Sequence, residues 1–474
     1  MQSPNLIDAN TQEATAHVKD SRAAIHRKLH KLPALRFEQQ TLTSFGGLVL
    51  VQALLSRVQL KERLRTCFAH VGVAPIFGHH LIALLLVVHL LLGYRELRDA
   101  RYYRDDPLLK RVLGLSRVPD VATISRALAQ ADARSVQRLR ALSRQLVLDR
   151  LQALALPRLT LDFDGSVIHT SRHAEGSAVG YCKAKKGARS YYPLFCTVAQ
   201  TGQVFDLLHR PGNVHDSRGA QAFLAECLER VRAIRSDTQL EVRLDSAFFS
   251  EATLATLATA GVEYSVSVPF ERFVELKALI EQRRRWRPIT SELAYFELEW
   301  KPKCWTSAAR FVCVRKRVAT RQLGPLQLDL FVPQGLGHEF KVIVTNKAVT
   351  AATILAFHNG RGAQEGVFAQ LKTQCQIDYV PCRRLVANQI FLLAGVIAHN
   401  LGRELQMVTR PVERMTTPTR MALWAFHELQ TLRRTLLARA GRLTRPQGEL
   451  TLTISANAEV QSEIRRHLQA LQVA

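Results

Sequence analysis

The sequence predicts an α+β protein of several domains, and three observations carry that prediction. Residues 45–154 are leucine-rich with helical spacing, residues 159–166 alternate as a strand does, and residues 293–345 hold further apolar, alternating segments. At 474 residues the chain is long enough for about three domains. We therefore expect helices in the first part of the chain and strands in its middle part, as in an α+β protein.

The charge of the chain indicates the kind of partner. Lys and Arg outnumber Asp and Glu by 65 to 40, which gives a formal net charge of +25 and favours a polyanion. The apolar run Leu81–Leu92 is too short to cross a bilayer, and the N-terminal residues show no secretory signal pattern. We expect a cytoplasmic protein that binds nucleic acid and has no membrane association.

The cysteines are expected to be buried free thiols. Eight of them are spread over a long chain without any CxxC pair, which favours neither a zinc site nor a disulfide framework.

The helical N-terminal region offers one candidate for DNA recognition. Residues 118–132 suit a short helix on which Thr123, Ser125 and Arg126 are available to phosphates or base edges, as in half of a helix-turn-helix. An ordinary amphipathic helix fits the same residues equally well, so the pattern leaves both interpretations open.

Carboxylates follow two predicted strands of the core. The alternation of residues 159–166 places Asp162 and Asp164 on one face, opposite the apolar side chains of Leu161 and Phe163. A hairpin turning at Thr201-Gly202 and a helix over residues 217–232 come next. The strand over residues 240–244 then ends at Asp245, and a further strand begins near residue 262.

The stretch HNGRGAQEGVFAQLK, residues 358–372, gathers charged side chains on one side. If the whole stretch is helical, His358, Arg361, Glu365 and Lys372 fall within an arc of roughly 60°. A surface ion pair is the competing interpretation. Three glycines in the stretch are unusual for an ordinary solvated helix, because each disfavours helix by about 1 kcal/mol relative to Ala.

This spacing resembles the signature of DDE transposases of the insertion-sequence 4 type, which is Tyr, two residues, Arg, three residues, Glu, six residues and Lys. His358 stands in the place of the Tyr, and Arg361, Glu365 and Lys372 fit the other positions. Asp164 is followed by a small and a hydroxyl residue, and Asp245 by a small and then an aromatic residue, as the family's aspartates are. The resemblance runs from about Thr43 to Leu401 and is strongest to the insertion-sequence 1380 group.

The resemblance implies an RNase-H-like core with Asp164, Asp245 and Glu365 as catalytic residues. Their carboxylates would also be the ligands of two Mg²⁺ or Mn²⁺ ions, which suit oxygen donors and in-line phosphoryl displacement. Asp162 would support Asp164. Arg361, Lys372 and His358 would contact the phosphates of the DNA.

A basic loop and an aromatic cluster are further candidate DNA contacts. The loop follows the strand of Asp164; the tryptophans lie in the arginine-rich segment 281–321, where their rings could stack on unpaired bases. A solvated loop and core tryptophans are the competing interpretations. The candidates are Lys183, Lys185, Lys186 and Arg189 in the loop, and Trp286, Trp300 and Trp305 in the segment.

The resemblance implies a DNA transposase that binds element ends and carries out cut-and-paste transposition, as a homodimer on double-stranded DNA at the nucleoid. A nuclease without strand transfer, or an inactive regulator that binds DNA, are the alternatives. The expected regions are a helical DNA-binding region (1–155), a catalytic core in two parts (156–270 and 346–404) around a β-rich insertion (271–345), and a helical C-terminal region (405–474).

Overall fold

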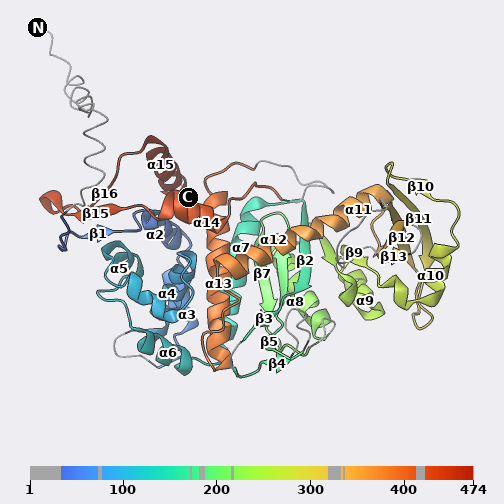
Figure 1. Ribbon diagram of the computed structural model, residues 1–474, viewed down its shortest axis with the longest axis horizontal. Helices are drawn as coiled ribbons and strands as arrows, with labels where there is room; N and C mark the ends of the chain where they lie inside the picture. The colour runs from blue at the N-terminus through green and yellow to red at the C-terminus, as the bar shows by residue number, and fades with distance from the viewer. Residues whose placement is uncertain are drawn as a thin grey trace, which may run out of the picture. The chain divides into compact units, whose positions relative to one another are not determined.

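A ten-stranded mixed sheet runs through the part of the chain that the structure describes (Figure 1). The structure is a computed structural model that describes residues 34–72, 77–170, 173–180, 187–214, 218–318, 337–412 and 422–472, with the backbone of 332–334. In spatial order the strands are β10 (Arg287–Pro288), β11 (Leu293–Trp300), β12 (Ala309–Arg317), β14 (His338–Thr345), β9 (Glu263–Ser267), β8 (Gln239–Leu244), β2 (Arg158–Gly165), β6 (Leu194–Val198) and β7 (Gln203–Leu208), while β13 (Val332–Gln334) pairs with β14 off this path.

The middle of the sheet is parallel and its flanks are antiparallel. β2 pairs in parallel with β8, and β8 with β9. β6 and β7 form the expected antiparallel hairpin, and its turn uses Gly202 at a φ of 60°, where glycine is favoured. The alternation along β2 is confirmed, since Leu161 and Phe163 are buried in a core shared with helix α8 (Ala220–Ile234), which connects the hairpin to β8.

The β-rich insertion is not a separate sheet. Strands β10 to β14 continue the central sheet because β14 pairs with β9 through Ile343, Val344 and Thr345. The apolar face of these strands also joins the core of the central strands, and helices α9 (Glu251–Thr259) and α10 (Val274–Glu281) contribute to that core. The predicted boundary at residue 271 therefore does not separate two cores.

Helices fill the region where the sequence predicted them. They are α2 (Leu48–Arg57), α3 (Leu60–Cys67), α4 (His79–Leu91), α5 (Pro107–Leu113), α6 (Val121–Gln130) and α7 (Ala133–Leu154) with the 3-10 turn η1 (Leu97–Tyr102), and they share a core with α13 (Leu385–Met407). α13 is the one described helix long and apolar enough to cross a membrane, but 83% of its apolar window is buried, as in a core helix.

The C-terminal region, which the sequence predicted to be helical, contains two strands as well as helices. Strands β15 (Gly441–Thr444) and β16 (Thr451–Ile454) pair with each other, and β15 also pairs with β1 (Leu42–Thr43) near the start of this unit. The helical part consists of α14 (Leu429–Leu432), the π-helical turn η5 (Arg433–Leu437) and α15 (Ala458–Gln472). A third small sheet joins β3 (Ile168–His169), β5 (Arg189–Tyr191) and β4 (Ala178–Val179).

The seven cysteines in the described ranges are all free; five of them are buried as predicted, whereas Cys304 is exposed and Cys382 is partly exposed.

Candidate active site

Two of the predicted catalytic carboxylates lie at the ends of neighbouring strands. β2 and β8 run parallel with Phe163 opposite Leu244, so the next residue on each strand is an aspartate, Asp164 or Asp245. Backbone N–H groups orient both, because Gly165 N donates to Asp164 Oδ1 at 2.8 Å and Ala247 N donates to Asp245 Oδ1 at 3.0 Å. The parallel pairing thus brings together residues 81 positions apart.

The electrostatics of this pair differ from those of an ordinary surface carboxylate. Burial, and then the negative charge of Asp245, raise the pKa of Asp164 to about 7, although Arg361 acts in the opposite direction. Two carboxylates this close repel each other unless a cation shares them. The arrangement is therefore suited to a positively charged ligand.

Arg361 joins the helix layer to this pair. Its Nη1 donates to Asp164 Oδ2 at 2.9 Å, and its side chain is only 9% exposed. Three residues on, Gln364 Nε2 donates to the backbone oxygen of Asp162 at 3.0 Å. Both contacts hold the start of α12 (Ala363–Gln374) against β2.

The expected continuous helix through residues 358–372 is interrupted. α11 (Ala351–Asn359) ends at a 3-10 turn, η4 (Gly360–Gly362), before α12 begins. Gly360 is required here, because a Cβ at that position would lie 2.2 Å from Nη1 of Arg243. A Cβ at Gly362 or Gly366 would meet open space.

Glu365 lies in the first turn of α12, four residues after Arg361, and is exposed. Arg361, which contacts Asp164, lies in η4 and is buried, whereas Glu365 lies on the exposed side of α12. Within the described ranges no group of three or more His, Cys, Asp and Glu side chains is arranged to hold a metal. The structure therefore brings Asp164 and Asp245 together and leaves Glu365 outside that pair.

Asp162 is sealed inside the protein. Its two carboxylate oxygens accept hydrogen bonds from Arg243 at 2.5 and 2.6 Å, and both side chains are at most 2% exposed. Arg243 also donates to the backbone oxygen of Phe357 at 3.0 Å. The sequence analysis missed Arg243 and Gln364. The parallel register, which places Arg243 beside Asp162, was the available signal for the first of them.

The predicted DNA contact of His358 is wrong. The ring is 1% exposed, and its two nitrogens are hydrogen-bonded to the hydroxyls of Ser267 at 2.8 Å and Ser265 at 3.0 Å on β9. Burial and then the charge of Lys341 lower its pKa well below the usual value. His358 is thus a neutral residue of the interior, between α11 and the sheet.

The remaining predicted contacts fall into different surroundings. Lys372 is half-buried in the last turn of α12, and burial lowers its pKa while Asp378 partly opposes the shift. Arg189 donates to the Ser177 hydroxyl at 3.0 Å and to the Ser177 backbone oxygen, so it fastens one loop to β5. Lys183, Lys185 and Lys186 lie outside the described residues.

The three tryptophans pack within the protein, which favours their interpretation as core residues. Trp300 meets Phe311 edge-on with ring centroids 5.2 Å apart, and Trp305 lies 4.8 Å from Phe249. Trp286 packs against Phe296 at 4.8 Å, and the guanidinium of Arg315 covers its ring at 4.7 Å. The Arg315 guanidinium thus already occupies the position over the Trp286 ring where an unpaired base would stack.

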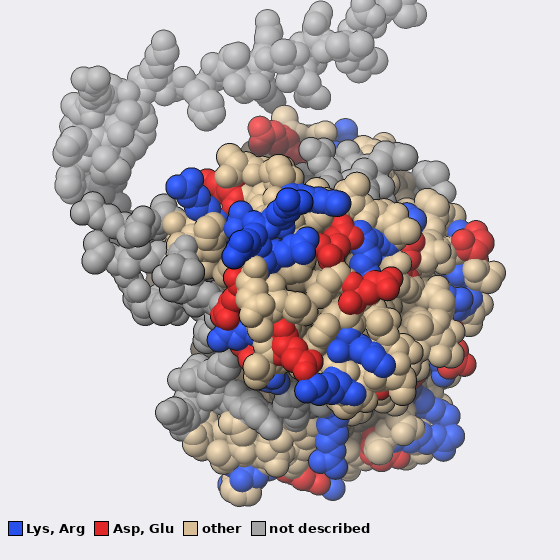
Figure 2. Space-filling view, turned by 90° about the vertical axis from the view of Figure 1, so that its right-hand side faces the viewer, with Lys and Arg blue, Asp and Glu red and all other residues tan. Residues whose placement is uncertain are grey.

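Exposed basic side chains do gather at this end of the sheet. Figure 2 faces this end and shows Lys and Arg concentrated in one area of its upper part. The segment before β10, β10 itself and the end of β12 hold six exposed basic residues: Arg283, Arg284, Arg285, Arg287, Lys316 and Arg317. We call these six residues the edge patch.

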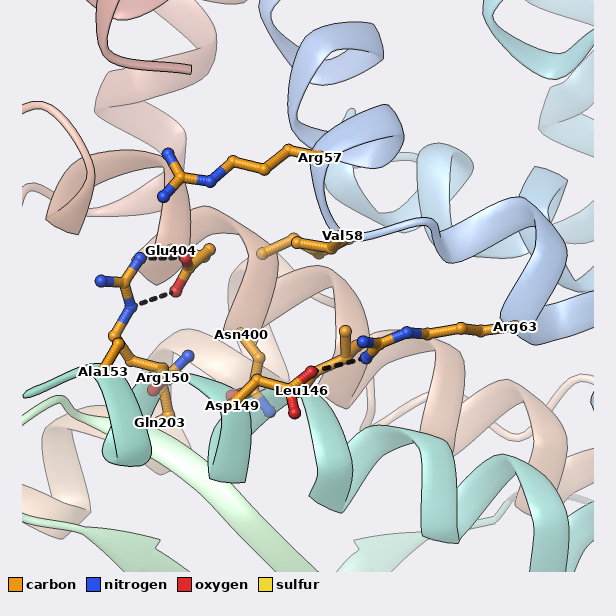
Figure 3. A pocket seen from close by; sticks show the side chains of 11 residues that line it. Arg57, Val58, Arg63, Leu146, Asp149, Arg150, Ala153, Gln203, Asn400 and Glu404 are labelled. Atoms are coloured by element: carbon orange, nitrogen blue, oxygen red, sulfur yellow. Dashed lines mark hydrogen bonds and ion pairs between the residues drawn. The ribbon is translucent and has the colours of Figure 1, made fainter. Parts of the chain in front are cut away.

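A cavity of about 200 Å³ lies between α2, α7 and α13 and includes none of the predicted catalytic residues (Figure 3). Arg63 pairs with Asp149 at 2.7 Å across it, and Arg150 Nε donates to Glu404 at 2.9 Å. Its charges are largely satisfied by one another, as expected of a contact between helices.

The chain is similar to known transposases over most of its length. Residues 28–474 match the family described as transposase DDE domain group 1. No curated protein sequence matches. Among solved structures, the piggyBac transposase synaptic complex with hairpin DNA has a TM-score of 0.42 at 10% identity, covering 90% of this chain and 84% of that one. The Mos1 transposase paired-end complex with the left transposon end has a TM-score of 0.18 at 13% identity, covering 41% and 60%.

A Mos1 mariner paired-end complex with manganese has a TM-score of 0.17 at 15% identity, covering 55% of this chain and 78% of that one. The family match spans nearly all of the sequence and includes every predicted catalytic residue. The chain belongs to the transposase DDE domain group 1 family and is a DNA transposase.

Proposed function

We propose that Asp164, Asp245 and Glu365 form the catalytic centre of this transposase, which cleaves DNA at the ends of a mobile element and joins them to target DNA. The observation that carries the proposal is the pair of aspartates on adjacent parallel strands, where each raises the cost of charging the other. The spacing of Arg361, Glu365 and Lys372 supports kinship with the insertion-sequence 4 type and its 1380 group.

The strand order supports an RNase-H-like core. Three antiparallel strands, β7, β6 and β2, are followed in the sheet by β8 and β9, which are added in parallel. In this arrangement Asp164 and Asp245 meet where the central strands β2 and β8 end. Helix α12, which carries Glu365, begins near that end.

The residues fit divalent metal ions, which DDE transposases use. Carboxylate oxygens are the donors that Mg²⁺ and Mn²⁺ prefer, and the repulsion between Asp164 and Asp245 is relieved by a cation. Two ions held by the three carboxylates would supply an activated water or 3′-hydroxyl and neutralise the leaving oxygen. Glu365 is exposed in the first turn of α12, the helix whose start is held against β2 by Gln364.

The protein's own residues hold and orient the DNA. Arg361 places a positive charge beside Asp164, where it opposes the repulsion of the scissile phosphate by the carboxylates. Open space at Gly362 and Gly366 leaves room for a strand to approach the helix. The edge patch supplies cationic contacts to a duplex backbone. The partners are double-stranded element ends and target DNA, bound by a homodimer.

Substitution of the aspartates tests this proposal. In Asp164→Asn and Asp245→Asn, metal-dependent cleavage of an element end is expected to fall by more than about a hundredfold. Loss of a residue that only hydrogen-bonds to a metal ligand already lowers activity about 10–100-fold, and here the ligand itself is lost. DNA binding should stay near wild type, since the basic contacts remain. Wild-type cleavage by either variant would refute the assignment.

A strand-transfer assay separates the proposed transposase from a nuclease without strand transfer. Pre-cut element ends are incubated with the wild-type protein, a target plasmid and Mg²⁺ or Mn²⁺. Joined products are expected, and cleavage of uncut ends without joining would support the nuclease. An inactive regulator would bind the ends and do neither.

A further inference from the structure

Asn359 occupies the exposed end of α11, directly after the buried His358 and two residues before Arg361. Its neighbours in the chain are held inside, because His358 contacts β9 and Arg361 contacts Asp164. Asn359 is therefore the side chain that this junction presents to the outside, at the edge of the candidate active site.

A buried lysine fixes the orientation of the Asn359 amide. Lys341 on β14 is 2% exposed, and its Nζ donates to Asn359 Oδ1 at 2.7 Å. An ammonium group has donors and no acceptor, so the atom facing it must be the amide oxygen. The Nδ2 group then faces away from Lys341, and none of the described residues accepts a hydrogen bond from it.

The surroundings of this amide are positively charged. Burial, and then the charge of Arg361, lower the pKa of Lys341 to about 7, so the two cations lie close enough to repel each other. Asp164 pairs with Arg361, but the burial of Lys341 and its repulsion by Arg361 still disfavour the charged lysine, and a further anion nearby would reduce that cost. An anionic group at the exposed end of α11 would be attracted by both cations and could accept from Nδ2.

We propose that the Asn359 amide donates a hydrogen bond to a backbone phosphate of the DNA beside Arg361, and that Lys341 is the positioning residue that holds this amide in its orientation. This inference rests on the proposed function, because it places DNA at the end of α11. It assigns to Asn359 the phosphate contact that the spacing of the sequence had suggested for His358.

A purely structural role is the competing interpretation: Asn359 would only provide an acceptor for the buried Lys341. The substitution Asn359→Asp distinguishes the two roles. An aspartate keeps the oxygen that accepts from Lys341 and adds an ion pair, so the fold is retained. It removes the Nδ2 donor and places a negative charge where the phosphate would lie.

The test measures binding of a labelled random-sequence duplex, since phosphate contacts do not depend on sequence. EDTA is present, so that cleavage does not interfere. The affinity of Asn359→Asp is expected to fall about tenfold, the effect of about 1.4 kcal/mol. Its melting temperature should equal or exceed that of the wild type.

Asn457→Asp is the matched control. Asn457 is an exposed asparagine whose Oδ1 accepts from Val460 N before α15, a role that aspartate also fills. The substitution adds the same negative charge away from α11 and α12. The affinity of this variant for the duplex should therefore change by less than about twofold in moderate salt.

Equal affinities of Asn359→Asp and Asn457→Asp would overturn the proposal. A loss of affinity accompanied by a lower melting temperature would also overturn it, because Asn359 would then act through the fold. If Asp164→Asn abolishes cleavage while Asn359→Asp binds DNA normally, this inference fails and the proposed function stands.

Discussion

Two aspartate–arginine pairs on the same face of β2, one sealed and one open, show how position decides what a carboxylate can do. Asp162 and Arg243 are at most 2% exposed and bind each other through two short hydrogen bonds. Asp164 is 21% exposed, makes one contact with Arg361, and lies beside a second carboxylate. The sealed pair supports the fold, whereas the open pair retains the capacity to bind a cation.

The largest expected effect concerns salt. If Arg361 at the candidate active site, the edge patch and other basic side chains together neutralise about six to ten phosphates, DNA affinity should fall about 10³–10⁵-fold between about 50 and 200 mM salt. In a plot of the logarithm of the affinity against the logarithm of the salt concentration, substitution of Arg361 by Met should make the slope shallower by about one. Titrations of duplex binding at several salt concentrations check both, and an affinity independent of salt would contradict DNA binding by these cations.

The second prediction compares the stability of the two pairs. Asp162→Asn leaves the charge of Arg243 buried without its partner, which costs about 3–5 kcal/mol of unfolding free energy. Asp164→Asn removes the repulsion from Asp245 and should leave stability unchanged or increase it. Denaturant unfolding of both variants provides the comparison, and equal losses in the two would show that the pairs do not differ as described.

The smallest effect is the pH dependence of the metal-free protein. The pKa of Asp164 is about 7 in the folded protein against an ordinary value of 3.8, so the folded state keeps a proton that the unfolded chain releases. Wild-type stability should therefore fall as pH rises from about 4 to about 7, relative to Asp164→Asn. Melting temperatures across this range test the sign, and parallel curves would show that the environment of Asp164 is ordinary.

The positions of the aspartates were predictable from the sequence because they depend on local patterns. Alternation along β2 predicted the face on which Asp164 lies, and alternation along β8 predicted a strand that ends directly before Asp245. The burial of His358 was not predictable in this way. The predicted direction of the His358 side chain assumed a continuous helix over residues 358–372, and the 3-10 turn at Gly360–Gly362 breaks the helical periodicity.

Pairing between distant segments was also beyond the sequence. The paired residues of β14 and β9 are 76 to 80 positions apart in the chain, and those of β15 and β1 are 398 and 400 positions apart. Such contacts are set by packing and carry no local signal. The same reason explains why Trp286 looked available for stacking, although Arg315 and Phe296 cover it.

We propose that Glu365 completes the catalytic centre, although it lies outside the pair formed by Asp164 and Asp245. The most direct test is cleavage of an element end by Glu365→Gln over a range of Mg²⁺ and Mn²⁺ concentrations, with DNA binding measured in parallel. We expect Glu365→Gln to bind DNA nearly as the wild type does and to lose cleavage at every metal concentration. Cleavage at the wild-type rate would contradict it.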